Sequence, residues 1–206
     1  MLYFPALNDR IITLSLQEFL EHGIRTMTMQ KLVLPLGIST KTMYKYFRNK
    51  EVLLEECLKV HYRNMGAGIH ELLMEAPNEV IALSVLYKKI AELDFGTNAL
   101  FYHDLNYYYP ELQDKVIKEF SSGPDKILTS VISKGIGKGY FLAELNPAVV
   151  FETLNMLYRS VSRQQAFKQF DLNPLEAINH TVAVYLRGIC TEEGLKILND
   201  HKQTTH

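Results

Sequence analysis

The sequence predicts an all-α fold, with a small N-terminal helical domain followed by a larger helical domain. Apolar residues recur at intervals of three and four residues along most of the 206-residue chain, and no segment keeps the two-residue alternation of a half-buried strand. Pro110, Pro147 and Pro174 stand where first turns of helices are expected, the helical position that proline tolerates best. These features predict about nine helices in total.

Four of these helices are expected before the Ala76-Pro77 step. The first covers residues 9–22, and Gly23 ends it. The other three each follow a residue whose side chain can cap a helix, namely Thr28 before residues 29–34, Ser39 before residues 40–47 and Asn49 before a long helix that opens with Lys50-Glu51. Pro35 and Gly37 are expected to end the second helix.

Further helices are expected beyond Pro77, at residues 78–95, 99–106, 110–135, 147–167 and 174–199. Ser122-Gly123-Pro124 interrupts the third of these segments, so residues 110–139 form either one kinked helix or two. The last two segments carry dense apolar stripes, which suit either an ordinary core or an interface between chains.

The composition indicates a globular protein without a membrane partner. Hydrophobic residues make up 47% of the chain and charged residues 22%, and no apolar run reaches the length of a membrane span. The N-terminal residues lack the basic and apolar regions of a secretory signal, so we expect a cytoplasmic location. The two cysteines lie far apart and the histidines do not cluster, so no metal site and no cofactor are expected.

The charges are distributed unevenly along the chain. Residues 25–50 hold six Lys and Arg residues and no Asp or Glu, whereas the formal charge of the whole chain is -1. A basic segment in an otherwise acidic chain is typical of an element that meets a polyanion, although a solvated basic surface has the same composition.

Residues 28–50 have the layout of a helix-turn-helix unit, whose second helix enters the major groove of DNA. Gly37 lies in the turn, where a positive φ lets two helices cross. Met43 and Phe47 share one face of the second helix and are expected to pack against Leu32 and Leu36. The opposite face then presents short polar, basic and phenolic groups that suit phosphates and base edges, namely Thr40, Lys41, Thr42, Tyr44 and Lys45.

The same segment resembles the TetR family of bacterial repressors. The family motif reads Gly-Val-Ser-x-x-Thr-Leu-Tyr-x-Tyr-Phe-x-x-Lys-Glu-x-Leu, and this chain has Gly37-Ile38-Ser39-Thr40-Lys41-Thr42-Met43-Tyr44-Lys45-Tyr46-Phe47-Arg48-Asn49-Lys50-Glu51-Val52-Leu53. The resemblance covers residues 9–58. The chain departs from the family pattern at Leu32-Val33, where Ile-Ala is usual, and at Pro35, where helix-forming residues are usual.

The resemblance implies a set of residues that contact double-stranded DNA, namely Thr28, Gln30, Ser39, Thr40, Lys41, Thr42, Tyr44, Lys45, Tyr46 and Lys50. Thr28, Thr42, Tyr44, Tyr46 and Lys50 are the expected phosphate contacts, and Gln30, Thr40, Lys41 and Lys45 the expected base contacts. Tyr46 is equally compatible with a partly buried position, because a phenol can bury its ring and keep its hydroxyl in water.

A small-molecule pocket and a dimer interface are also implied by the resemblance. The aromatic residues between positions 95 and 109 suit either a ligand pocket or plain packing, and Tyr102, His103 and Asn106 are the pocket candidates. The two final apolar segments follow the Gly135-to-Phe141 loop, as the family's dimer helices do. The expected interface residues are Leu154, Leu157, Val161, Val182, Leu186 and Ile189.

The sequence therefore predicts a homodimeric, ligand-responsive repressor that reads a palindromic operator through residues 40–47. Residues 1–50 form the expected DNA-binding domain, and residues 51–206 the expected effector-binding and dimerisation domain. No catalytic residues are expected, because the glycines at 135, 137 and 139 fit neither phosphate-binding pattern and no nucleophile motif is present. The alternatives are an enzyme or a protein-interaction module with a vestigial helix-turn-helix.

Overall fold

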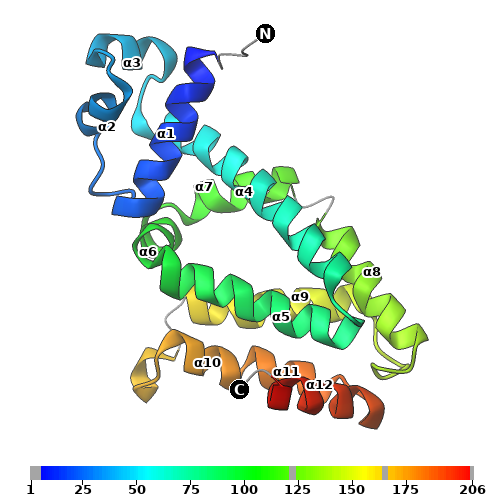
Figure 1. The fold of residues 1–206 in the computed structure, drawn as a ribbon. Coiled ribbons are helices and arrows are strands. Elements are labelled where there is room, and N and C mark those ends of the chain that lie inside the picture. Colours follow the sequence, from blue (N-terminus) through cyan, green and yellow to red (C-terminus); the bar gives the residue numbers. More distant parts are fainter. Residues whose placement is uncertain (1–5, 121–123, 164–166, 205–206) are drawn as a thin grey trace. The chain divides into compact units, whose positions relative to one another are not determined.

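The computed structural model describes residues 6–120, 124–163 and 167–204, and this part of the chain is helical almost throughout (Figure 1). It contains no β-strand; Phe141 and Cys190 pair at one isolated antiparallel bridge. The all-α prediction is confirmed. Residues 1–5 and the Ser122-Gly123 step, on which we based sequence expectations, lie outside the described residues.

The chain forms two compact units that do not follow the order of the sequence. The N-terminal unit contains residues 1–65 and 98–120, and the second unit contains residues 66–97 and 121–206. Residues 98–120 thus belong to the same compact unit as residues 1–65, although 32 residues of the other unit separate them in the sequence. The sequence predicts a boundary between residues 50 and 51, which separates the DNA-binding part from the effector-binding part. This boundary is defined by function and not by packing, and it stays a prediction.

The N-terminal unit is built from α1 (Leu7–His22), α2 (Met29–Leu36), α3 (Thr40–Tyr46), the first part of α4 (Lys50–Glu75), α6 (Ala99–Tyr108) and α7 (Pro110–Phe120). Helix α1 packs against α2 and α6, and α2 packs against α3. The largest fully buried side chains of this unit are Phe19, Phe101, Ile11, Ile24, Leu32, Met43, Leu53, Leu54 and Leu58. One core therefore joins the three short N-terminal helices to α4 and α6.

Helix α2 continues through Pro35 and ends at Leu36, which corrects the expected end at residue 34. A proline this close to the C-terminus of a helix removes one hydrogen bond of the last turn, and little helix follows it. Gly37 provides the actual stop. It adopts the left-handed conformation at φ 64°, and its N–H donates to the Leu34 carbonyl at 3.2 Å.

The second unit is built from the end of α4, α5 (Glu79–Glu92), α8 (Pro124–Gly137), α9 (Pro147–Ser162), α10 (Pro174–His180), α11 (Val182–Gly188) and α12 (Glu192–Thr204). A π-helix (Leu93–Thr97) follows α5 and a 3₁₀ turn (Lys168–Phe170) precedes α10. Pro110, Pro147 and Pro174 each begin a helix, as predicted. The core of the unit lies between α5, α8, α9 and α11.

The described residues contain the twelve helices α1–α12, more than the nine or so expected. The segment at 110–135 is two helices, α7 and α8, which answers the question left open by the sequence. The segment at 174–199 is three. The Thr181 hydroxyl donates to the Ala177 carbonyl at 2.7 Å where the first break falls, and Thr191 donates its N–H to the Tyr140 carbonyl at the second.

Candidate nucleic-acid interface

Two serine and threonine caps define the starts of α2 and α3. The Thr28 hydroxyl accepts a hydrogen bond from the Lys31 N–H at 3.2 Å, and the Ser39 hydroxyl accepts one from the Thr42 N–H at 3.0 Å. Ser39 Oγ also lies 2.9 Å from Thr42 Oγ1. Both caps agree with the sequence expectation, because each depends on residues only three positions apart.

Helix α3 has one buried face and one exposed face. Met43 and the following Phe47 are buried, as are Leu32 and Leu36 of α2. Lys41, Tyr44 and Lys45 are exposed, and their spacing of three and four residues places them on a common side of the helix. Thr40 and Thr42 are half-buried. This division is the one that the sequence predicts.

The two tyrosines of α3 are equally accessible. Tyr44 is 45% exposed and Tyr46 is 44% exposed, so both phenol groups reach solvent. The sequence left open whether Tyr46 is more buried than Tyr44. The two side chains are in fact exposed to the same degree. A phenol hydroxyl on the surface of a DNA-binding helix can donate a hydrogen bond to a phosphate oxygen.

Lys50 is the first residue of α4, where the positive end of the helix dipole favours an anion. Asn49 caps this helix by accepting the Val52 N–H at 2.9 Å. Partial burial lowers the pKa of the Lys50 ammonium; the Asp104 carboxylate opposes this shift and the Arg25 guanidinium adds to it. A half-buried ammonium at a helix N-terminus is well placed to bind a phosphate group.

Three exposed residues of this region were not among the sequence candidates. Lys31 lies in α2 and Arg48 follows α3, and both are exposed within the acid-free segment at 25–50. The basic run itself was the available signal for them. Leu34 is also exposed, and no sequence pattern distinguished it from the buried leucines beside it.

The turn between α1 and α2 is packed closely against α6. Gly23 ends α1 at φ 80°, and a Cβ at this position would lie 2.6 Å from Leu100 Cγ. The Arg25 guanidinium donates to the Tyr108 hydroxyl at 2.8 Å, and its Cζ lies 4.1 Å from the Tyr108 ring centroid. Glycine is required at position 23 both by the positive φ and by this close approach.

The family comparison identifies this arrangement. The model described as "Bacterial regulatory proteins, tetR family" matches residues 11–57, which contain α2, α3 and the capped start of α4. The chain matches the TetR family over these residues. It is a helix-turn-helix transcriptional regulator, and α3 is the second helix of that motif.

Other proteins are similar to this chain over most of its length. An uncharacterized HTH-type transcriptional regulator of Bacillus subtilis, YvkB, is 20% identical and covers 90% of this chain and 98% of its own. A regulator from Cytophaga hutchinsonii has a TM-score of 0.69 at 19% identity, covering 89% of this chain and 98% of its own. FadR of Bacillus subtilis, solved with stearoyl-CoA, has a TM-score of 0.64 at 19% identity, covering 88% and 98%. The solved structures share the fold of this chain.

The three expected pocket residues lie on α6 in the N-terminal unit and have different surroundings. Tyr102 is buried, and its hydroxyl lies 2.8 Å from Nε2 of His61. His103 is exposed and stacks on Tyr107, with ring centroids 6.0 Å apart. Asn106 is half-buried. The structure therefore does not bring the three side chains into one cavity wall.

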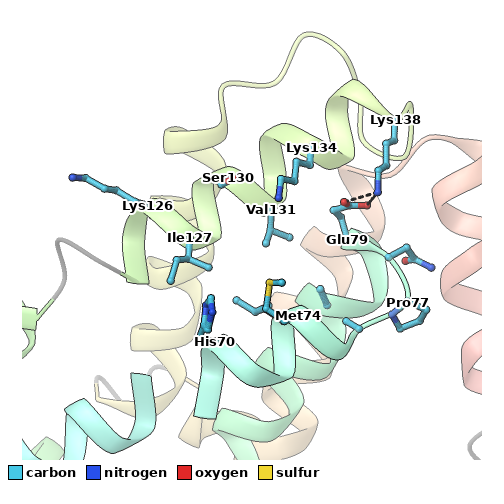
Figure 2. A pocket seen from close by; sticks show the side chains of 14 residues that line it. His70, Met74, Pro77, Glu79, Lys126, Ile127, Ser130, Val131, Lys134 and Lys138 are labelled. Carbon is cyan, nitrogen blue, oxygen red and sulfur yellow. Dashed lines mark hydrogen bonds and ion pairs between the residues drawn. The ribbon is translucent and has the colours of Figure 1, made fainter. Parts of the chain in front are cut away.

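A cleft of about 500 Å³ lies instead in the second unit, between the end of α4, the start of α5 and α8 (Figure 2). Its lining includes His70 and Met74 of α4, Glu79 of α5, Lys126 and Lys134 of α8, and Lys138 directly after α8. None of the three expected residues lines it. The residues that line this cleft were not among the sequence candidates, although Lys126, Ser130 and Lys134 follow one another at four-residue intervals and so share one side of a helix.

The expected dimer residues are placed mainly in the core of a single chain. Leu154, Val161, Val182, Leu186 and Ile189 are buried and Leu157 is half-buried. Helices α9, α10 and α11 instead expose four other large apolar residues, Val149, Met156, Leu175 and Val184. The expected interface residues stay a prediction, and the four exposed residues form a second candidate surface on the same helices.

The described residues contain no group of three or more His, Cys, Asp or Glu side chains that could hold a metal ion. Within the same part of the chain, no helix is both long and apolar enough to cross a membrane.

Proposed function

We propose that this chain is a homodimeric, ligand-responsive repressor that binds a palindromic operator through α3. The observation that carries the proposal is the exposed side of α3, where Lys41, Tyr44 and Lys45 project from a helix whose other side is buried. A helix of this kind can enter a major groove and present donors to bases and phosphates.

The residues of the region divide into two roles. Thr28, Ser39, Thr42, Tyr44, Tyr46 and Lys50 are proposed to position the chain on phosphates, because their donors lie at helix starts or on exposed phenols. Gln30, Thr40, Lys41 and Lys45 are proposed to reach base edges. Only the second group can distinguish one sequence from another.

Dimerisation is proposed through the outward-facing residues of α9, α10 and α11. Val149 and Met156 lie seven residues apart on α9, and hence on one side of it, and both are exposed; Leu175 and Val184 are exposed on the helices that follow. A symmetric pair of such surfaces would bury them, and two copies of α3 would then read two half-sites.

Ligand response is proposed from the family and from the bound stearoyl-CoA in the FadR structure. In this proposal residues 51–206 form the effector-binding part, with Tyr102, His103 and Asn106 as candidate pocket residues. The dimer can adopt conformations that differ in the separation of its two α3 helices. A ligand that binds one of these conformations more tightly than another would increase the population of that conformation. A regulator of this type acts in the cytoplasm, where bacterial DNA lies.

The experiment is a gel-shift titration of the purified chain with duplex DNA from upstream of its own gene, with a shuffled duplex of equal composition as control. Tight, salt-sensitive binding that prefers the natural duplex is the expected result. Failure to bind either duplex at low salt would favour a protein-interaction module or an enzyme with a vestigial helix-turn-helix. Repression itself is measured with a reporter placed behind the bound sequence.

A further inference from the structure

The cleft between α4, α5 and α8 has an apolar floor. Seven of its lining residues carry no polar side-chain atom: Leu73, Met74, Ala76, Pro77, Ala82, Ile127 and Val131. In Figure 2 the side chains of Met74, Ile127 and Val131 point into the space between α4 and α8. A volume of about 500 Å³ is within the range of small-molecule sites. The floor therefore suits the apolar part of a small ligand.

The α8 side of the cleft is lined with ammonium groups. Lys126, Lys134 and Lys138 all line it, and their spacing is a multiple of four residues. Lys138 is neutralised, because both carboxylate oxygens of Glu79 lie within hydrogen-bond distance of its Nζ, at 2.8 and 3.0 Å. Lys126 and Lys134 have no carboxylate within 4.0 Å among the described side chains. Within the described part of the chain, two positive charges at the cleft therefore have no carboxylate partner.

These free charges contrast with the unit in which they lie. The second unit contains 11 Lys and Arg residues and 13 Asp and Glu residues, whereas the cleft lining contains three lysines and one glutamate. Figure 2 shows the Lys134 side chain directed toward the floor and the Lys126 side chain directed outward at one end. A local excess of positive charge beside a low-dielectric floor attracts an anion into the cleft.

We propose that this cleft binds a small anionic amphiphile, a carboxylate or phosphate carried on a short aliphatic chain. The anionic group pairs with Lys134, and Lys126 adds a second positive charge at one end of the cleft. The aliphatic chain lies on Met74, Ile127 and Val131. Glu79 holds Lys138 at the other end of the cleft, which leaves Lys134 as the anchor. The link from this site to DNA binding rests on the proposed function, but binding at the cleft does not.

The test is isothermal titration calorimetry of the full chain with two probes, octanoate and octyl phosphate, each kept below the concentration at which it forms micelles. The expected result is saturable binding with one molecule per chain, and the two probes decide between the headgroups. Butyrate should bind about 250-fold more weakly than octanoate, because octanoate has four more methylenes and each buried methylene contributes about a fourfold change in affinity. Octyltrimethylammonium, which has the same tail and the opposite charge, should not bind.

A pair of lysine variants locates the site. Lys134→Gln should weaken binding of the better probe about tenfold, the usual effect of losing a charge-assisted hydrogen bond. Lys88→Gln is the matched control, because Lys88 is an exposed lysine of α5 outside the cleft, and it should bind as the wild type does. Both positions are exposed, so circular dichroism should show unchanged folding.

Three results would overturn the proposal: no saturable binding of either anion, equal binding of the cationic probe, or an equal effect of the two lysine variants. A gel shift on the same samples separates this proposal from the proposed function. If the chain binds the anion but not DNA, the proposed cleft is supported and the proposed regulator function is contradicted. If the chain binds DNA but not the anion, the regulator function is supported and the proposed cleft is contradicted.

Discussion

The carboxylate of Asp104 accepts a hydrogen bond from the backbone N–H of Arg25, 79 positions earlier in the chain, at 2.8 Å. Asp104 is buried on α6, and Arg25 lies in the turn between α1 and α2. The helix-turn-helix is thus held from outside its own sequence, by a charged acceptor on a helix that the family model does not reach.

We predict that Asp104→Ala lowers the free energy of unfolding by about 1–3 kcal/mol, because a charge-assisted hydrogen bond is lost and a partly buried N–H is left without its acceptor. Affinity for DNA should fall as well, since the turn before α2 loses its anchor. Urea denaturation followed by circular dichroism measures the first effect. Glu111→Ala, at an exposed acid of α7, is the control, and equal stability of the two variants would contradict the role of Asp104.

Tyr44→Ala and Lys50→Ala are predicted to weaken binding to operator and random DNA to the same degree, because phosphate contacts carry no sequence information. For Lys50→Ala the slope of log affinity against log salt should also fall by about one, as one ion contact is lost. Gel shifts at several salt concentrations measure both. Loss confined to the operator would argue that these side chains read bases instead.

Lys41→Ala and Lys45→Ala are predicted to reduce discrimination between operator and altered operator by about 1–3 kcal/mol at individual base pairs. Both side chains are exposed on α3, on the side opposite the buried Met43. Competition gel shifts with single base-pair substitutions locate the positions that are read. If the ranking of the substituted duplexes is the same in wild type and both variants, the base readers lie elsewhere.

Leu186→Glu and Met156→Glu are predicted to have different effects. Leu186 lies in the core of the second unit, so a buried carboxylate there should destabilise the fold by about 3 kcal/mol or more. Met156 is 68% exposed, so its substitution should change stability by less than about 0.5 kcal/mol while it weakens the dimer. Sedimentation velocity and thermal unfolding separate the two effects. A Met156→Glu chain that associates like the wild type would place the interface elsewhere.

His61 is predicted to make the N-terminal unit less stable in acid. Burial among Tyr62, Phe101 and Tyr102 lowers its pKa to about 4, below the ordinary value of 6.5. The folded chain therefore keeps His61 neutral while the unfolded chain gains a proton, and stability falls as the pH drops from 6.5 toward 4. The loss reaches about 3 kcal/mol at most, at about 1.4 kcal/mol per pKa unit.

His61→Gln, which cannot titrate but keeps polar atoms near Tyr102, should remove most of this loss. The comparison of variant and wild type is needed because Asp94 acts in the opposite direction. Burial raises the pKa of Asp94 to about 6, so its contribution to stability is lost as the pH rises from about 4 to 6. Denaturation at pH 7.5, 6 and 4.5 measures the difference. Parallel curves for His61→Gln and wild type would assign the pH dependence to other groups.

The helix-turn-helix could be predicted closely because its signals are local. The caps at Thr28 and Ser39 and the left-handed Gly37 involve partners within three or four positions, so the sequence alone specifies them. The division of α3 into a buried and an exposed side also follows from its own spacing. The effect of Pro35 was predicted wrongly. Pro35 lies one residue before the end of α2, where its missing N–H removes only one hydrogen bond, so the helix continues through it.

The sequence by itself determined that the chain is helical, where α2, α3 and α4 start and which side of α3 faces outward. Tertiary structure alone decided that Asp104 holds the turn at Arg25, that Leu186 lies inside while Met156 lies outside, and that α8 lysines meet the end of α4. The physical reason is that helical periodicity specifies an apolar side without naming the partner that covers it. Where both sides of a helix carry large apolar residues, as on α9, only packing against the rest of the chain selects the buried one.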